Sequence, residues 1–117
     1  MYGPPFWFLT NDRAGRDIAL SHRRWDQHIK ANHPWFDEGM IPAIRETIEN
    51  PDKACESDRN SHEAEFWRRY VDTDGTSDYL MVVVRYDTLI QSAVSGDVVT
   101  AYYEVGIDCR GAVLWTR

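Results

Sequence analysis

The sequence predicts a single α+β domain, with two or three N-terminal helices packed on a C-terminal antiparallel β-meander. Three observations predict this class. Apolar residues recur at helical spacing between residues 21 and 49. Short segments rich in β-branched and aromatic residues, separated by turn residues, follow from residue 53 onward. A chain of 117 residues has room for one domain, so we expect an N-terminal arm of residues 1–20 and one domain over residues 21–117.

Two segments have the pattern of amphipathic helices. Ser21 suits the N-cap of a helix over residues 22–31, and a His-Pro pair follows the end of that helix. Trp25 and Ile29 lie on one face of it, so we expect both to be buried against the sheet. The second helix covers about residues 38–49 and ends before an Asn-Pro pair. Its buried stripe consists of Met40, Ile41, Ile44 and Ile48.

The rest of the chain is predicted to form strands. The segments are residues 53–57, 63–71, 79–86, 98–105 and 112–116. The segment 63–71 is also compatible with a helix, whereas the segment 79–86 has the clearest strand pattern. Its alternation places Met81, Val83 and Arg85 on one face of the strand and the residues between them on the other. An Asp-Gly pair marks a hairpin turn before this strand.

The net charge limits the functional classes. It is −6, which is unusual for a nucleic-acid binder, because such proteins carry a basic surface. The charge is uneven, however. Residues 1–34 contain five Lys/Arg against three Asp/Glu, and residues 35–66 contain three against nine. A local basic cleft is therefore compatible with an acidic chain.

The sequence indicates a cytoplasmic protein that binds no metal and no other cofactor. Its longest apolar run is too short to span a bilayer, and its first residues lack the pattern of a signal peptide, so we expect no membrane partner. Cys55 and Cys109 are far apart in the sequence and are expected to be two reduced thiols. Neither has another Cys or His at ligand spacing.

Two histidines are candidates for acid–base chemistry, because an imidazole titrates near neutral pH. His28 flanks the apolar stripe of the first helix and is expected to face the sheet. Its structural alternative is a buried histidine bonded to a backbone carbonyl. His33 follows the end of the helix, where the helix dipole alone favours a histidine. The two are five residues apart, off the i, i+4 register of helical metal ligands.

Arginine and hydroxyl side chains on the strands are candidates for binding a phosphate. Arginine binds phosphate with two parallel hydrogen bonds, and Arg59, Arg68 and Arg85 lie on or beside predicted strands. Thr100 and Tyr102 share one face of the last long strand. Each has an ordinary alternative, which is a solvated sheet edge for the arginines and strand propensity for the threonine.

Six segments carry a resemblance to a known family. They are WDQHIKANHP (25–34), NPD (50–52), FWRRY (66–70), YLMVVVRY (79–86), VVTAYY (98–103) and RGAVLW (110–115). Their order resembles the small nuclease domains of the phage barnase–EndoU–colicin E5/D–RelE group, nearest to their second phage-associated subfamily. The chain departs from that group at Trp35, where a glutamate is typical.

The resemblance implies N-terminal helices packed on a four-stranded antiparallel sheet, and metal-independent RNA cleavage in the cleft between them. In the implied reaction a ribose 2′-OH attacks the adjacent phosphorus. The implied catalytic residues are His28 or His33, Arg68 or Arg85, and Thr100, and the implied substrate-binding residues are Arg59, Tyr70 and Tyr102. The implied partners of such a toxin-like ribonuclease are RNA and an antitoxin or immunity protein.

A non-catalytic protein-binding module of the same fold is the alternative, and the net charge of −6 favours it. The surface beside His28 distinguishes the two hypotheses. A basic cleft there favours the ribonuclease, and a uniformly acidic face favours the module.

Overall fold

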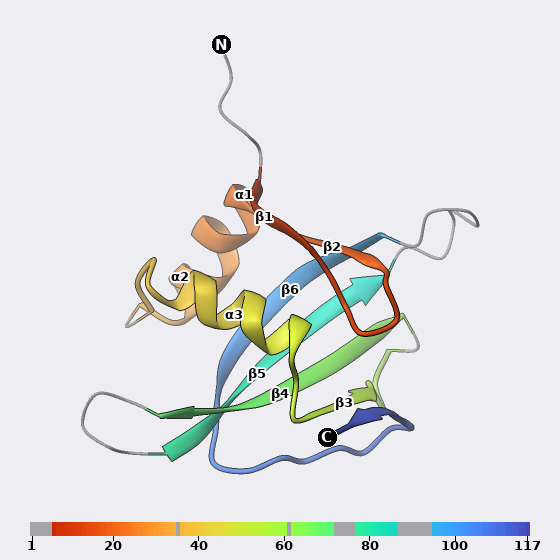
Figure 1. The fold of residues 1–117 in the computed structure, drawn as a ribbon. Helices are drawn as coiled ribbons and strands as arrows, with labels where there is room; N and C mark the ends of the chain where they lie inside the picture. The colour runs from red at the N-terminus through yellow and green to blue at the C-terminus, as the bar shows by residue number, and fades with distance from the viewer. Residues whose placement is uncertain (1–5, 35, 61, 72–76, 87–94) are drawn as a thin grey trace.

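A seven-stranded mixed sheet forms the centre of the protein in the computed structural model, which describes residues 6–34, 36–60, 62–71, 77–86 and 95–117 (Figure 1). The strands are β1 (Phe6–Asn11), β2 (Asp17–Ser21), β3 (Lys53–Glu56), β4 (Glu63–Val71), β5 (Ser77–Tyr86), β6 (Ser95–Glu104) and β7 (Val113–Thr116). Their order across the sheet is β1-β2-β6-β5-β4-β3-β7. β2 and β6 are parallel, and the other neighbouring pairs are antiparallel.

The predicted fold class, N-terminal helices on a four-stranded antiparallel sheet, is wrong. The protein is mainly sheet, and residues 6–21 supply two of the strands. The Asp12 carboxylate closes the turn between these strands, because it accepts hydrogen bonds from the backbone N–H groups of Ala14 and Arg16. The hairpin joins the sheet where β2 pairs with the start of β6. A parallel pair of segments so far apart in the chain leaves no local sequence pattern.

Residues 22–32 form one helical segment, made of α1 (His22–Arg24), a π-helical turn (Trp25–Ile29) and α2 (Lys30–Asn32). Ser21 is its N-cap, as predicted, because its Oγ accepts a hydrogen bond of 3.0 Å from the backbone N–H of Arg24. The predicted burial of Trp25 and Ile29 is confirmed, and Trp25 is only 1% exposed. In the described part of the chain, no helix has the length and apolar character needed to cross a bilayer.

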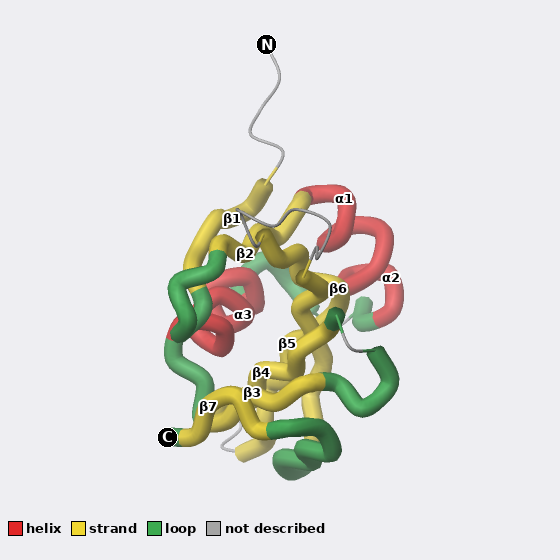
Figure 2. The backbone as a smooth tube through the Cα atoms, turned by 90° about the vertical axis from the view of Figure 1, so that its right-hand side faces the viewer, coloured by secondary structure: helices red, strands yellow, loops and turns green. Residues whose placement is uncertain are grey.

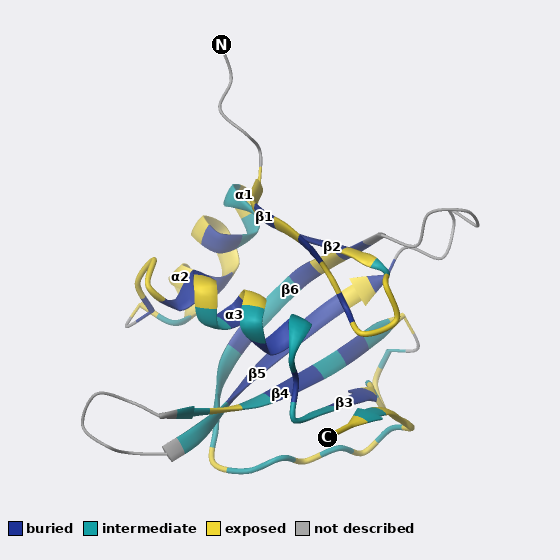
Figure 3. Ribbon diagram, viewed as in Figure 1, coloured by how far each residue is buried: buried dark blue, intermediate teal, exposed yellow. Residues whose placement is uncertain are grey.

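The second helix, α3 (Met40–Glu49), crosses one face of the sheet (Figure 1). Its predicted stripe is confirmed, since Ile41, Ile44 and Ile48 are buried in the main core (Figure 3). The sheet side of this core includes Leu80, Val82 and Val84 of β5. The residues between them, such as Met81 and Val83, belong to a smaller buried cluster on the opposite face, which confirms the predicted alternation of this strand.

β4 and β5 pair antiparallel over their whole described length, so the segment 63–71 is a strand and not the helical alternative. The hairpin turn predicted at residues 72–76 lies outside the described residues.

A disulfide joins Cys55 of β3 to Cys109 in the segment that leads to β7. The prediction of two reduced thiols is therefore wrong, because the fold brings together two cysteines that are 54 residues apart. The same segment approaches β3 so closely at Gly111 that an added Cβ would lie 2.0 Å from the carbonyl oxygen of Glu56. The backbone N–H of Glu56 donates to the carbonyl of Ala112 at 2.8 Å. The C-terminal segment is thus tied to β3 at Cys109 and again just after it, at Gly111 and Ala112.

Candidate functional site

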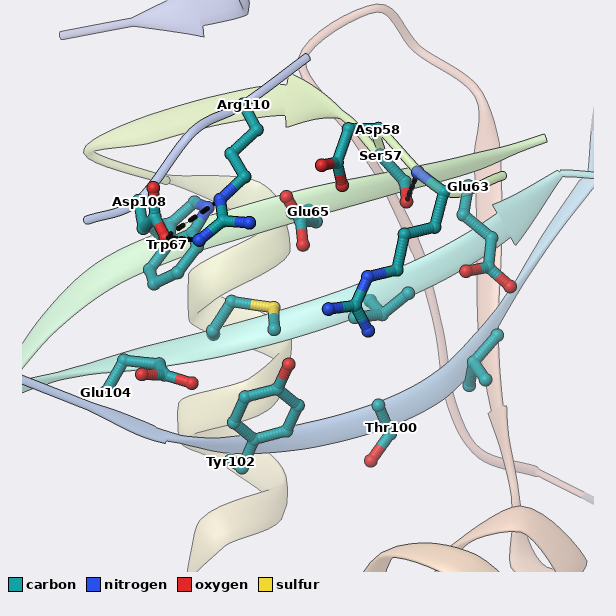
Figure 4. Close-up of a pocket in the computed structure, with 14 residues that line it drawn as sticks. Ser57, Asp58, Glu63, Glu65, Trp67, Thr100, Tyr102, Glu104, Asp108 and Arg110 are labelled. Atoms are coloured by element: carbon teal, nitrogen blue, oxygen red, sulfur yellow. Dashed lines mark hydrogen bonds and ion pairs between the residues drawn. The ribbon is translucent and has the colours of Figure 1, made fainter. Parts of the chain in front are cut away.

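A cleft of about 300 Å³ lies on the face of the sheet opposite α3 (Figure 4). Its floor comes from β4, β5 and β6, and its rim from the residues before β4 and the segment after β6. The lining side chains are Ser57, Asp58, Arg59, Glu63, Glu65, Trp67, Met81, Val83, Val99, Thr100, Tyr102, Glu104, Asp108 and Arg110. Figure 2 shows the helical segment of residues 22–32 beside β6. Its buried residues Trp25 and Ile29 belong to the main core that α3 also covers.

A β-bulge in β6 shapes the floor of the cleft. Val84 is paired with Val98 and Val83 with Thr100, which leaves Val99 as an extra residue between two pairs. Strict alternation would place Val99 on the face opposite Thr100. The bulge instead lets both residues line the cleft.

The C-terminal segment supplies one wall of the cleft. Arg110 and Asp108 form an ion pair of 3.2 Å at its surface (Figure 4). Cys109 lies between these two residues and is covalently bound to Cys55, a fully buried residue of β3. The disulfide therefore holds this wall in place.

Glu65 is the carboxyl group whose protonation the cleft alters most clearly. Burial raises its pKa, and the negative charges of Asp58 and Asp108 raise it further. Arg59 and Arg110 act in the opposite direction and do not cancel the increase. A carboxyl group with a raised pKa exchanges protons closer to neutral pH, as a general acid or base requires.

Tyr102 lies across the cleft from β4 and also has an altered pKa. Burial raises the pKa of its phenol, and the charges of Glu104 and Glu65 add to the increase, while Arg59 opposes it. The phenol therefore keeps its proton at neutral pH. Arg59, Glu65 and Tyr102 all line this cleft, so their side chains surround one volume.

Trp67 contributes a buried donor to the floor of the cleft. Its side chain is 3% exposed, and its indole Nε1–H has no hydrogen-bond partner among the described residues. The ring lies beside the Asp108–Arg110 ion pair (Figure 4). A buried N–H without an acceptor costs free energy, and such a cost is tolerated most readily where a ligand supplies the acceptor.

The cleft is acidic in composition, but several of its charges are paired. Five carboxylates and two arginines line it. Arg85 binds Glu63 with two hydrogen bonds of 2.6 and 2.9 Å, and Arg110 binds Asp108. Within the described part of the chain, the guanidinium of Arg59 forms no ion pair, so it remains available to a ligand.

The cleft contains three of the residues predicted from the sequence, and two others adjoin it. Arg59, Thr100 and Tyr102 line it directly. Arg85 lies at its rim through the ion pair with Glu63. The ring of His33 stacks on that of Tyr102 with the centroids 5.9 Å apart, and burial lowers the pKa of its imidazole.

The other predicted residues lie elsewhere. Arg68 is on the α3 side of the sheet, where its guanidinium donates to the carbonyl of Asn50 at 2.6 Å. Tyr70 is on the same side and packs on Tyr103. His28 is exposed, although its spacing from Trp25 predicts that it faces the sheet. The wider π-helical turn rotates the residue three positions after Trp25 away from the core.

Sequence reasoning missed Glu65, Trp67 and the Asp108–Arg110 pair. Alternation along β4 contains the signal for the first two, because it places them on one face of the strand. No comparable signal exists for the C-terminal wall, whose position depends on the disulfide.

The described residues contain no group of three or more His, Cys, Asp or Glu side chains arranged to hold a metal ion. No protein-family model matches the chain, and neither a curated protein nor a solved structure matches it significantly.

Proposed function

We propose that the cleft opposite α3 is the active site of a metal-independent endoribonuclease. One observation carries the proposal. A carboxyl group with a raised pKa, a guanidinium without an ion pair and a hydroxyl group line the same cleft, on Glu65, Arg59 and Thr100. Cleavage of RNA by its own 2′-OH needs a proton acceptor, a positive charge near the phosphate and a donor to its oxygens.

In the proposed reaction, the carboxylate of Glu65 takes the proton of a ribose 2′-OH. The 2′-oxygen forms a bond to the adjacent phosphorus, and the bond from phosphorus to the 5′-oxygen breaks. Tyr102 gives its phenolic proton to the departing 5′-oxygen, and both groups return to their starting states by exchange with water. The products are a 2′,3′-cyclic phosphate and a free 5′-OH.

Arg59 and Thr100 stabilise the phosphate in this scheme. The guanidinium faces the negative charge that grows on the phosphate oxygens, and the threonine hydroxyl donates a hydrogen bond to one of them. Positioned proton transfer is worth on the order of 10²–10⁴-fold in rate. The assignment replaces the histidine of the sequence hypothesis, His28 or His33, with Glu65. It replaces the strand arginine, Arg68 or Arg85, with Arg59, and it keeps Thr100.

Pairing of charges makes the acidity of the cleft compatible with an RNA substrate. Glu63 and Asp108 are bound by arginines, so two of the five carboxylates that line the cleft are paired with a positive charge. The two sequence hypotheses differ in the charge that they predict for the surface beside His28. This surface is a hollow lined by Arg23 and Arg24. It is basic, and this supports the ribonuclease.

The test is cleavage of a labelled RNA strand by purified protein in the presence of EDTA. We expect wild type to give products ending in a 2′,3′-cyclic phosphate, and Glu65→Gln to lose on the order of 10²–10⁴-fold in rate. Glu38→Gln removes an exposed carboxylate just before α3 and is the matched control. A wild-type protein without cleavage above buffer, or a Glu65→Gln variant as active as Glu38→Gln, would refute the proposal.

The second candidate is a module that binds a cationic protein segment. The observation that favours it is the excess of five carboxylates over two arginines in the cleft. In that case Glu65→Gln weakens binding of a lysine-rich peptide, and no RNA cleavage accompanies the binding.

The location is part of the proposal as well. The sequence predicts the cytoplasm, where thiols keep most cysteines reduced. The Cys55–Cys109 disulfide is instead typical of proteins in oxidising compartments. We therefore propose that the active form works outside the reducing cytoplasm.

A further inference from the structure

A second hollow lies on the helical segment 22–32, outside the cleft. Its volume is about 220 Å³, and Ser21, Arg23, Arg24, Gln27 and His28 line it. The segment carries three cations, Arg23, Arg24 and Lys30, against one carboxylate, Asp26. This basic surface contrasts with the acidic lining of the cleft.

Neither guanidinium of the hollow forms an ion pair with any residue that the structure describes. Arg23 is exposed and donates only to the side-chain oxygen of its helical neighbour Gln27, at 3.2 Å. Arg24 is half-buried, and its guanidinium forms no ion pair in the described part of the chain. Two arginines that are free of carboxylates and lie one after the other on a surface are suited to adjacent phosphates.

An aromatic side chain adjoins the basic surface. The ring of Trp7, from β1, lies on the ring of His22 with the centroids 4.6 Å apart. Trp7 is 37% exposed, so part of its ring is open to solvent. Positive side chains next to an exposed aromatic ring are the combination that holds single-stranded nucleic acid, through phosphate contacts and base stacking.

From these observations we propose that residues 21–28, with Trp7, form a binding track for the single-stranded RNA that flanks the scissile bond. The helical segment packs beside β6, whose Thr100 and Tyr102 line the cleft, and His33 just after the segment stacks on Tyr102. The track rests on the proposed function, because its RNA is the substrate of the cleft. It contacts phosphates and stacks on bases without reading them, so it favours single strands and not a particular sequence.

The test measures binding without cleavage. The probe is a short fluorescein-labelled DNA strand, which lacks the 2′-OH and cannot be cleaved by the proposed reaction. We expect an Arg23→Gln/Arg24→Gln variant to bind this strand about tenfold more weakly than wild type. We also expect the plot of the logarithm of the binding constant against the logarithm of the salt concentration to become less steep. Its slope should change by about 1.4, because two phosphate contacts are lost.

Two controls separate the track from general effects of charge or folding. Arg45→Gln removes one exposed arginine on α3, outside the hollow, and should leave binding unchanged. Arg23→Lys/Arg24→Lys keeps both charges and should restore most of the affinity and the salt dependence. Equal weakening by Arg45→Gln, or an Arg23→Gln/Arg24→Gln variant that binds like wild type, overturns the track.

The experiment also distinguishes this inference from the proposed function. If wild type binds the strand and the double variant does not, while neither cleaves RNA, the track stands and the ribonuclease fails. If wild type cleaves RNA and the double variant binds the strand as tightly as wild type, the track fails and the ribonuclease stands.

Discussion

The two faces of the sheet are built from the same strands but are occupied differently. On the face covered by α3, alternate residues of β5 join a continuous apolar core with Ile44 and Ile48. On the open face, the residues between them form a small cluster around Trp67 and Met81, with charged side chains around it. The covered face holds the fold together, whereas the open face keeps carboxyl groups and a donor N–H without a described partner at a cost in free energy, and our proposal of a ligand-binding cleft starts from this difference.

The disulfide should make the largest contribution to stability on the open face. It closes a long loop, for which the chain-entropy model gives about 4 kcal/mol. We expect a Cys55→Ser/Cys109→Ser variant to lose about this much free energy of unfolding in urea. The cleft wall should loosen as well, so RNA cleavage should fall while the variant is still folded. A loss of stability with full cleavage would mean that the wall does not depend on the bond.

The covered face should respond to truncation in the opposite way. Ile44→Ala leaves a cavity in the main core and should cost about 2–5 kcal/mol in urea unfolding. Cleavage by the folded fraction should remain near the wild-type rate, because Ile44 lies on the other side of the sheet from the cleft. Val99→Ala, in the floor of the cleft, is the comparison variant and should cost less. A large loss of cleavage rate in folded Ile44→Ala would show that the faces are not independent.

The smallest expected change in stability comes from two glutamates, Glu65 and Glu49, whose pKa values shift in opposite directions. Burial and nearby carboxylates raise the pKa of Glu65. Folded protein therefore binds this proton more tightly than unfolded protein, and stability falls as pH rises through the raised pKa. Thr10 and Arg45 donate hydrogen bonds to Glu49 and lower the pKa of its carboxyl group. Glu49 therefore stabilises the folded protein above the ordinary pKa of a glutamate, and this stabilisation is lost as pH falls through the lowered pKa.

Glu65→Gln should therefore be slightly more stable than wild type near neutral pH, and the difference should vanish in acid. Glu49→Gln should be slightly less stable near neutral pH, again with convergence in acid. Melting temperatures measured across this pH range test both signs. Two variants that shift in the same direction would contradict the electrostatic contrast between these positions.

The local elements of the fold could be predicted from the sequence, because they depend on short patterns. The strand around Val82, the stripe of Ile44 and the N-cap Ser21 follow from alternation, helical spacing and capping chemistry, and all three are present. The exposed position of His28 could not be predicted in this way, since a π-helical turn changes the spacing on which the prediction depends.

The arrangement of the elements was beyond such patterns. The parallel pair of β2 and β6 and the Cys55–Cys109 bond join distant parts of the chain. For the same reason, the complete candidate site could not be predicted from local patterns. Thr100 could be identified on its strand, but its neighbours at the C-terminal wall are set by long-range contacts.

The placement of that wall has a consequence for the order in which the protein is completed during synthesis. The cleft combines Asp58 from the middle of the chain with Arg110 near its end. The N-terminal hairpin likewise joins the sheet only through the pairing of β2 with residues 95–97 of β6, so it cannot do so before those residues have been synthesised. Contacts of such long sequence separation form late. A nascent chain on the ribosome therefore has no complete cleft until Arg110 has emerged from the exit tunnel.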